Sequence, residues 1–222
     1  MSSGIPSSIQ SAPLLKQWVR LLDDGTFQIY SGKVELGQGI STALVKVACE
    51  ELGIHPDMVD LVAGHTANSP DEGYTAGSLS IEVGATALRH ACIRMRQLFA
   101  LQAAKHLAVD VQDLVLDQGI FGTGHTQEEI GFHALAKNIN FELIRADTPI
   151  DSSSDVKKVV RLPEEAFRRF DLKGKFTGPG FVHDMVRDHM LHARILRGPH
   201  AQAIATNVDR LQLQSFEGIS EV

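Results

Sequence analysis

Cysteine is scarce in this sequence, which contains only Cys49 and Cys92 among 222 residues. Two thiols cannot build a disulfide framework, and they cannot supply the four ligands of a structural zinc site or an iron–sulfur cluster. No apolar run approaches the roughly 18 residues that a membrane-spanning helix needs. Residues 1–15 have neither a basic start nor a long apolar stretch, so they do not read as a secretory signal. These absences predict a cytoplasmic protein, with export alongside a partner as the open alternative.

An excess of positive charge is also lacking. Lys and Arg number 21 against 27 for Asp and Glu, which gives a formal net charge of −6. A surface of this sign does not offset phosphate repulsion, which argues against a general nucleic-acid binder. Hydrophobic residues make up 43% of the chain and charged residues 22%, as in ordinary globular proteins.

The familiar catalytic and phosphate-binding signatures are missing as well. The sequence has no GxGxxG, no GxxxxGK[ST] and no GxSxG. Both cysteines fall on apolar helix faces, so we expect them to be buried and inert. Consecutive glutamates such as Glu50 and Glu51 point in different directions on a helix and do not form an acid/base pair. The residues therefore identify no catalytic group in this chain.

Several histidines gather near the C-terminal end, with Asp184 and Asp188 among them: His183, His189, His192 and His200. Their spacing fits neither a helical pair of ligands nor a hairpin ligand pattern. We expect surface or interface histidines and no side-chain metal site.

The hydrophobic pattern predicts an α+β fold. Residues 16–30 read as a hairpin that leads into a short strand and a glycine-flanked turn over 31–39. Helices are expected over 40–53 and 80–106, and they would pack on a small mixed sheet that includes a strand over 58–63. A second hairpin is expected over 113–122. Toward the C-terminus, residues such as Met190 to Leu196 read as strands and turns.

Composition divides the chain into segments. Residues 1–13 are expected to be a disordered Ser/Pro-rich arm. Residues 14–144 form the main segment, residues 145–168 read as a linker, and a new segment runs over 169–222.

The first candidate site is Gly37-Gln38-Gly39, a turn at a strand-to-helix junction. Glycines allow close approach of the backbone to a ligand, and the helix that follows presents unpaired N–H groups and the positive end of its dipole. The Gln38 amide offers donors and an acceptor that suit the edge of a heterocycle. The alternative is a tight turn in which the glycines serve geometry alone.

The second candidate is the Thr75–Ser80 loop, which also opens onto a helix. Backbone N–H groups around Gly77, together with the hydroxyls of Ser78 and Ser80, would form an anion cradle without a lysine. Simple capping of the helix by Ser78 or Ser80 is the alternative. We expect the two loops to converge on one extended, phosphate-bearing ligand. A generic phosphate-binding protein is a weaker reading of the same residues.

The sequence resembles a known family over two long stretches. Residues 31–44 (SGKVELGQGISTAL), followed by Glu50-Glu51-Leu52, and residues 71–81 (DEGYTAGSLSI) look like the molybdenum-binding large subunit of the xanthine dehydrogenase family. The isoquinoline 1-oxidoreductase and nicotinate dehydrogenase branch is the most similar. Residues 169–178, 183–185 and 190–197 resemble the start of the family's hammerhead domain, an α/β domain that would be incomplete here.

The resemblance implies a molybdenum cofactor, molybdopterin as its cytosine dinucleotide, held by Gly37, Gln38 and Gly39 on one loop. The contacts of the second loop carry over to Gly77, Ser78 and Ser80. It implies no side-chain metal ligand, because the cofactor's dithiolene binds the metal. It also implies a hydroxylase of N-heteroaromatic or aldehyde substrates that takes its oxygen from water.

The family pattern is not complete in this chain. The catalytic glutamate of the family lies in a C-terminal motif that is not found here, so we expect a complementary C-terminal half of the large subunit. The further expected partners are a small [2Fe–2S] subunit and a cytochrome c or another electron acceptor. The alternative is a non-catalytic fragment or assembly module that folds against a partner subunit.

Overall fold

The computed structural model describes residues 5–124, 127–137, 139–151, 155–159, 168–178, 185–195, 197–204 and 206–219. Contacts along the chain divide it into two units, Met1–Gly180 and Phe181–Val222. The first unit contains both candidate loops.

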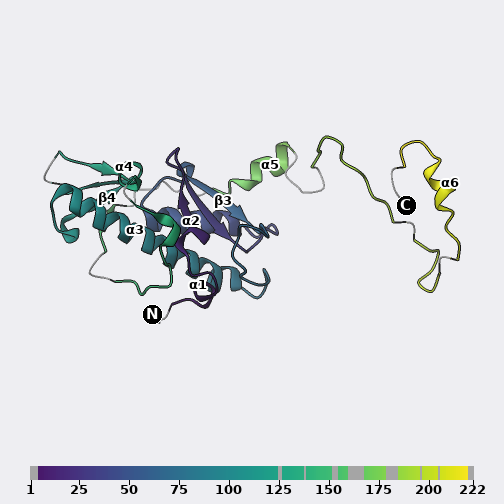
Figure 1. The fold of residues 1–222 in the computed structure, drawn as a ribbon, viewed down its shortest axis with the longest axis horizontal. Helices are drawn as coiled ribbons and strands as arrows, with labels where there is room; N and C mark the ends of the chain where they lie inside the picture. The colour runs from purple at the N-terminus through teal and green to yellow at the C-terminus, as the bar shows by residue number, and fades with distance from the viewer. Residues whose placement is uncertain are drawn as a thin grey trace. The chain divides into compact units, whose positions relative to one another are not determined.

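A βαβ arrangement forms the centre of the first unit (Figure 1). Strand β1 (Val19–Leu21) pairs antiparallel with β2 (Phe27–Ser31), and β2 pairs parallel with β3 (Val59–Ala63). Helix α2 (Ile40–Leu52) connects the two parallel strands and ends at Gly53, whose φ of 65° suits a glycine. The hairpin, the helix and the mixed sheet expected from the sequence are therefore confirmed.

The long helix expected over 80–106 begins differently from the prediction. Residues Ser80–Ala85 form a π-helical segment, η3, and the regular helix α3 covers Thr86–Leu107. Neither Ser78 nor Ser80 caps it with its side chain. Instead the Ser78 carbonyl accepts hydrogen bonds from the N–H groups of Ile81 and Glu82, at 3.2 and 3.3 Å. Such π-helical segments are frequent at functional sites.

A second small sheet has the strand order β6-β5-β4-β7 among the described residues. Strands β4 (Val115–Asp117) and β5 (Ile120–Gly122) form the hairpin expected over 113–122. Strand β6 (Ile130–Gly131) pairs with β5, and β7 (Lys157–Val159) pairs parallel with β4. Residues 157–159 were expected to lie in a linker. They join the sheet because Val156 is buried and Asp155 binds Arg96 of α3.

Short helices connect these elements. They are α1 (Ser7–Ser11), η1 (Leu15–Gln17), η2 (Pro56–Met58), η4 (Val111–Asp113), α4 (Phe132–Ala136), η5 (Phe141–Leu143) and α5 (Asp171–Thr177). Helix α1 lies in the arm that the sequence predicts as disordered. It is ordered because Ile9 is fully buried and the Trp18 indole donates a 2.8 Å hydrogen bond to the Ala12 carbonyl just after it.

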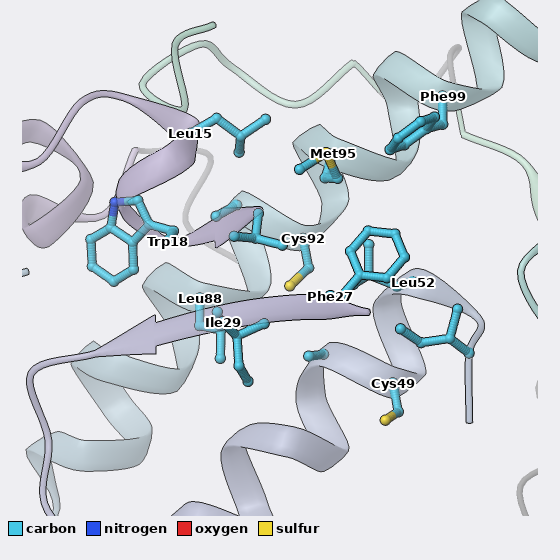
Figure 2. Close-up of a cluster of buried hydrophobic side chains, with 14 of the residues drawn as sticks. Leu15, Trp18, Phe27, Ile29, Cys49, Leu52, Leu88, Cys92, Met95 and Phe99 are labelled. Atoms are coloured by element: carbon cyan, nitrogen blue, oxygen red, sulfur yellow. The ribbon is translucent and has the colours of Figure 1, made fainter. Parts of the chain in front are cut away.

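One hydrophobic core connects both sheets with α2 and α3. Figure 2 shows the part of this core that β2, α2 and α3 form. Trp18, just before β1, and Phe27 of β2 are fully buried, and the Phe27 ring packs edge-to-face on Phe99 of α3 with 6.5 Å between the ring centroids. Phe132 packs edge-to-face on Phe99 at 4.7 Å and on Phe121 of the second sheet at 5.2 Å. Aromatic edge contacts of this kind add to area burial. This core fixes the end of β2 and the start of α2, between which the first candidate loop lies.

A buried ionic network reinforces the same helices. Glu51 of α2 lies 2.7 Å from Arg96 of α3, 2.8 Å from Arg89 and 2.8 Å from Lys158 of β7. Burial alone would raise the pKa of Glu51, but hydrogen bonds from Lys158 and Arg96 outweigh it and lower the pKa. Glu51 is therefore a structural carboxylate that binds three cations of neighbouring elements.

The second unit, Phe181–Val222, consists of α6 (Arg210–Gln214) and irregular chain over its other described residues. The strand expected near 190–196 is not formed over 190–195, and residue 196 lies outside the described residues. His189, His192 and His200 are exposed, and His183 lies outside the described residues. The mixed α+β character of the chain is confirmed, and the hammerhead assignment stays a prediction.

Candidate functional site

The Gly37-Gln38-Gly39 turn lies directly before α2. Strand β2 ends at Ser31, and residues 32–39 are an irregular loop, so the short strand expected here is not formed. Gly37 and Gly39 have φ values of 102° and 86°, a region that only glycine adopts at little cost. Gln38 is therefore presented between two residues whose backbone conformation requires glycine.

Glu35 occupies the N-terminal end of α2. Its Oε1 accepts the N–H groups of Gly37 and Gly39 at 2.8 and 2.9 Å, and its Oε2 accepts the Ser41 N–H at 3.1 Å. Burial raises the pKa of Glu35, but these three donors outweigh it and leave the pKa below its ordinary value. The sequence predicts free N–H groups at this helix end. The structure corrects this in part, because the chain's own carboxylate accepts the Ser41 N–H together with those of Gly37 and Gly39 just before the helix.

The Gln38 side chain is held in one orientation by its own loop. Its Oε1 accepts the Leu36 N–H at 2.6 Å, and its Nε2 donates to the Val34 carbonyl at 3.1 Å. A primary amide has two N–H donors and two acceptor lone pairs. One N–H and one lone pair of Gln38 therefore stay available to a ligand, in a fixed direction.

The second loop presents backbone and hydroxyl groups before η3. Gly77 and Ser78 both have positive φ, at 60° and 63°. Ser78 is a non-glycine residue in this region, an uncommon conformation that small polar residues tolerate. The Leu79 N–H donates a 3.1 Å hydrogen bond to the Ala76 carbonyl. The Ser78 side chain is exposed.

Both loops line one surface pocket of about 430 Å³. Gln38 and Gly39 contribute from the first loop, and Gly77, Ser78 and Ser80 contribute from the second. Gly37 does not line it. The rest of the lining comes from Thr75 and from the apolar residues Leu36, Ile40, Ala43, Ala76 and Ile81. The expected convergence of the two loops is thus a property of the structure.

A set of hydrogen bonds between residues 31–33 and residues 72–74, here called the Lys33–Glu72 clasp, holds the loops together. The Glu72 carboxylate accepts the Ser31 hydroxyl at 2.7 Å and the Gly32 N–H at 2.6 Å. The fully buried Lys33 donates in return to the carbonyls of Glu72 and Tyr74, at 2.6 and 2.9 Å.

The clasp also reaches η3. A Cβ added to Gly84 would lie 2.9 Å from the second carboxylate oxygen of Glu72 and 3.2 Å from Lys33 Cγ. None of Lys33, Glu35 and Glu72 is predicted as a site residue from the sequence. The sequence does hold one signal that these residues have partners. All three are charged residues inside glycine-rich loops, where burying a charge without a partner would be costly.

Other reactive groups lie away from this pocket. Both cysteines are fully buried, as expected, and burial raises the pKa of Cys49 to about 12 and that of Cys92 further. Over the described part of the chain, no three His, Cys, Asp or Glu side chains gather closely enough to hold a metal ion. None of the helices described there combines the length and hydrophobicity that crossing a bilayer requires.

A family model and several relatives match most of the first unit. A family model described as a molybdopterin cofactor-binding domain matches residues 2–168. A nicotinate dehydrogenase subunit of Pseudomonas putida is 32% identical over 90% of this chain and 17% of its own length. The 6-hydroxypseudooxynicotine dehydrogenase complex subunit gamma of Paenarthrobacter nicotinovorans is 30% identical over 55% of this chain and 16% of its own length.

Among solved structures, the reconstituted CO dehydrogenase of Oligotropha carboxidovorans is 26% identical, with a TM-score of 0.49, over 53% of this chain and 15% of that one. The chain thus spans less than a fifth of the length of these relatives. The family match covers residues 2–168, which include both loops and the pocket between them. The chain therefore belongs to the molybdopterin cofactor-binding domain family, within the molybdenum-binding subunits of the xanthine dehydrogenase family of oxidoreductases.

Proposed function

We propose that the pocket between the two loops holds the pterin part of a molybdenum cofactor. The observation that carries this proposal is that Gln38 and Ser78, from motifs about 40 residues apart, line a single pocket. The family model supports it, because the matched residues include both loops.

The groups in the pocket fit such a ligand. The edge of a pterin ring alternates hydrogen-bond donors and acceptors, and the fixed Gln38 amide offers one of each. Apolar lining from Leu36, Ile40 and Ile81 suits the faces of a flat heterocycle. We assign Gly39 to the close backbone contact, with Gly37 shaping the turn from outside the pocket.

The anionic part of the cofactor belongs at the second loop. Glu35 already neutralises the N-terminal end of α2, so a phosphate near Gly37 would meet a carboxylate. The backbone at Gly77, with the hydroxyls of Ser78 and Ser80, offers donors without a competing negative side chain among the pocket-lining residues. We propose the cytosine dinucleotide form of the cofactor, as the family resemblance implies.

The complete enzyme would be a molybdenum hydroxylase. The bound cofactor supplies oxygen transfer and accepts the electrons, and this chain binds and orients it. We propose N-heteroaromatic or aldehyde substrates with water as the oxygen source, because relatives are named nicotinate dehydrogenase and aldehyde oxidase. The catalytic glutamate would come from a complementary C-terminal half. Electrons would leave through a small [2Fe–2S] subunit to a cytochrome c or another acceptor, in the cytoplasm.

Pterin retention tests this assignment. The chain is co-expressed with a complementary C-terminal half in a host that makes molybdopterin, and bound pterin is measured by fluorescence after oxidation. Gln38→Ala removes about one or two hydrogen bonds and is expected to lower retention about five- to tenfold. Gln112→Ala, an exposed glutamine outside the pocket, is the matched control. Absence of pterin from the wild-type complex, or equal retention by Gln38→Ala and the control, would contradict the proposal.

A further inference from the structure

Arg169 contacts the Gly37-Gln38-Gly39 turn from a distant part of the sequence. Its Nη1 donates a 2.8 Å hydrogen bond to the Gly37 carbonyl, 132 residues earlier in the chain. Its Nη2 lies 3.6 Å from Oε1 of Glu35, the oxygen that accepts the Gly37 and Gly39 N–H groups. A Cβ added to Gly39 would lie 3.5 Å from the Arg169 side chain. Arg169 therefore touches the turn at a carbonyl, at a carboxylate and at a glycine.

Asp171 fixes the direction of this guanidinium. Arg169 Nε donates to Asp171 Oδ1 at 3.0 Å, and Nη2 donates to Oδ2 at 2.5 Å. Lys175, one turn further along α5, donates to the same Oδ2 at 2.6 Å. Hydrogen bonds from Arg169 and Lys175 hold the pKa of Asp171 well below its ordinary value. A forked pair of this kind orients the guanidinium as well as neutralising its charge.

The turn thus has its polar groups fixed from two directions. Glu35 holds the N–H groups of Gly37 and Gly39, and Arg169 holds the carbonyl of Gly37. Gln38 lies between these glycines, so its place in the pocket depends on both contacts. Removal of Arg169 would leave the partly buried Glu35 carboxylate without its neighbouring cation.

We propose that Arg169 is a positioning residue for the pterin-binding turn, acting through Glu35 and the Gly37 carbonyl. This inference rests on the proposed function of the pocket. Arg169 lies just beyond residues 2–168, which the family model matches. The segment that begins α5 is therefore part of the cofactor site's support, although it does not line the pocket. The competing view is a surface ion pair that only attaches α5 and contributes little, as most exposed pairs do.

Amide hydrogen exchange at Gly37, Gly39 and Ser41 in the full chain, without cofactor, separates the two views. Arg169→Gln is expected to speed exchange at these amides about tenfold, the effect of one lost charge-assisted hydrogen bond. Arg169→Lys is expected to restore only part of the protection. A lysine keeps the positive charge, but its ammonium cannot bond the Gly37 carbonyl and also form the two-pronged pair with Asp171. Arg168→Gln, at the adjacent exposed arginine, is the matched control. Pterin retention in the co-expressed complex is measured for the same variants and for Gln38→Ala.

The inference is supported if Arg169→Gln speeds exchange at the turn and lowers pterin retention about tenfold while Arg168→Gln changes neither. Exchange equal to that of the control overturns it, whatever happens to pterin. Faster exchange with undiminished retention also overturns it, and a loss of retention in Gln38→Ala would then leave the proposed function standing. A wild-type complex without pterin refutes the proposed function, and the positioning role falls with it.

Discussion

Replacing Lys33 by Met tests the Lys33–Glu72 clasp. Methionine fills similar space without the ammonium, so the change leaves the carbonyls of Glu72 and Tyr74 without their buried donor. Hydrogen bonds to a charged group contribute about 1.5–3 kcal/mol each. The variant no longer has to desolvate an ammonium, which returns part of this energy. We expect a net loss of about 3 kcal/mol in the free energy of unfolding.

The assay is thermal and urea unfolding of the full chain at neutral pH. For a domain of this size, 1 kcal/mol corresponds to about 2–4 °C in Tm, so Lys33→Met should melt about 6–12 °C lower. Exchange at the amides of residues 73–80 should also become faster, because Lys33 anchors that loop. Lys105→Met, at an exposed position on α3, is the matched control. If Lys33→Met melts within about 2 °C of this control, the clasp does not stabilise the loops and the reasoning is refuted.

Two further predictions concern groups outside the pocket. Glu51→Gln should destabilise the chain by about 1.5–3 kcal/mol at pH 7, because the buried Arg96 keeps Asp155 but loses its charged hydrogen bond to Glu51. Since folding lowers the pKa of Glu51, its contribution is present above the ordinary value of 4.5 and is lost as the pH falls through the lower folded pKa. Urea unfolding from pH 3 to pH 7 should show that the free energy of unfolding of the wild type falls toward low pH, and that it falls less in Glu51→Gln. The same pH dependence in both proteins would contradict this prediction. The thiols of Cys49 and Cys92 should react with Ellman's reagent at pH 8 about 100-fold more slowly in the native chain than in urea, because burial raises both pKa values. Equal rates would show that the helices do not shield them.

Periodicity predicted the central elements because local rules decide them. The apolar face from Ile40 to Ala48 and the stop at Gly53 set α2, and the Asp24-Gly25 turn set the first hairpin. The two loops that line the pocket were also found, because glycine and serine before a helix are local signals.

The remainder depended on contacts between distant residues. Glu35, Lys33 and Glu72 gain their roles from partners across loops, and no spacing rule identifies those partners. Strand β7 and helix α1 had weak local patterns and are ordered by burial against α3 and the core. The Glu72 and Lys33 side chains also lie close to Gly84 in η3, another contact between distant residues.

The distance along the chain between Gly37 and Arg169 has a consequence for biosynthesis. A ribosome makes the turn 132 residues before it makes the guanidinium that completes it. During that interval β2, α2 and β3 can assemble, since domains fold from the N-terminal side as they emerge. The Glu35 carboxylate then has no Arg169 guanidinium beside it until residues 169–171 leave the exit tunnel. The βαβ centre can therefore form early during synthesis, and the turn beside it gains its contacts with Arg169 later.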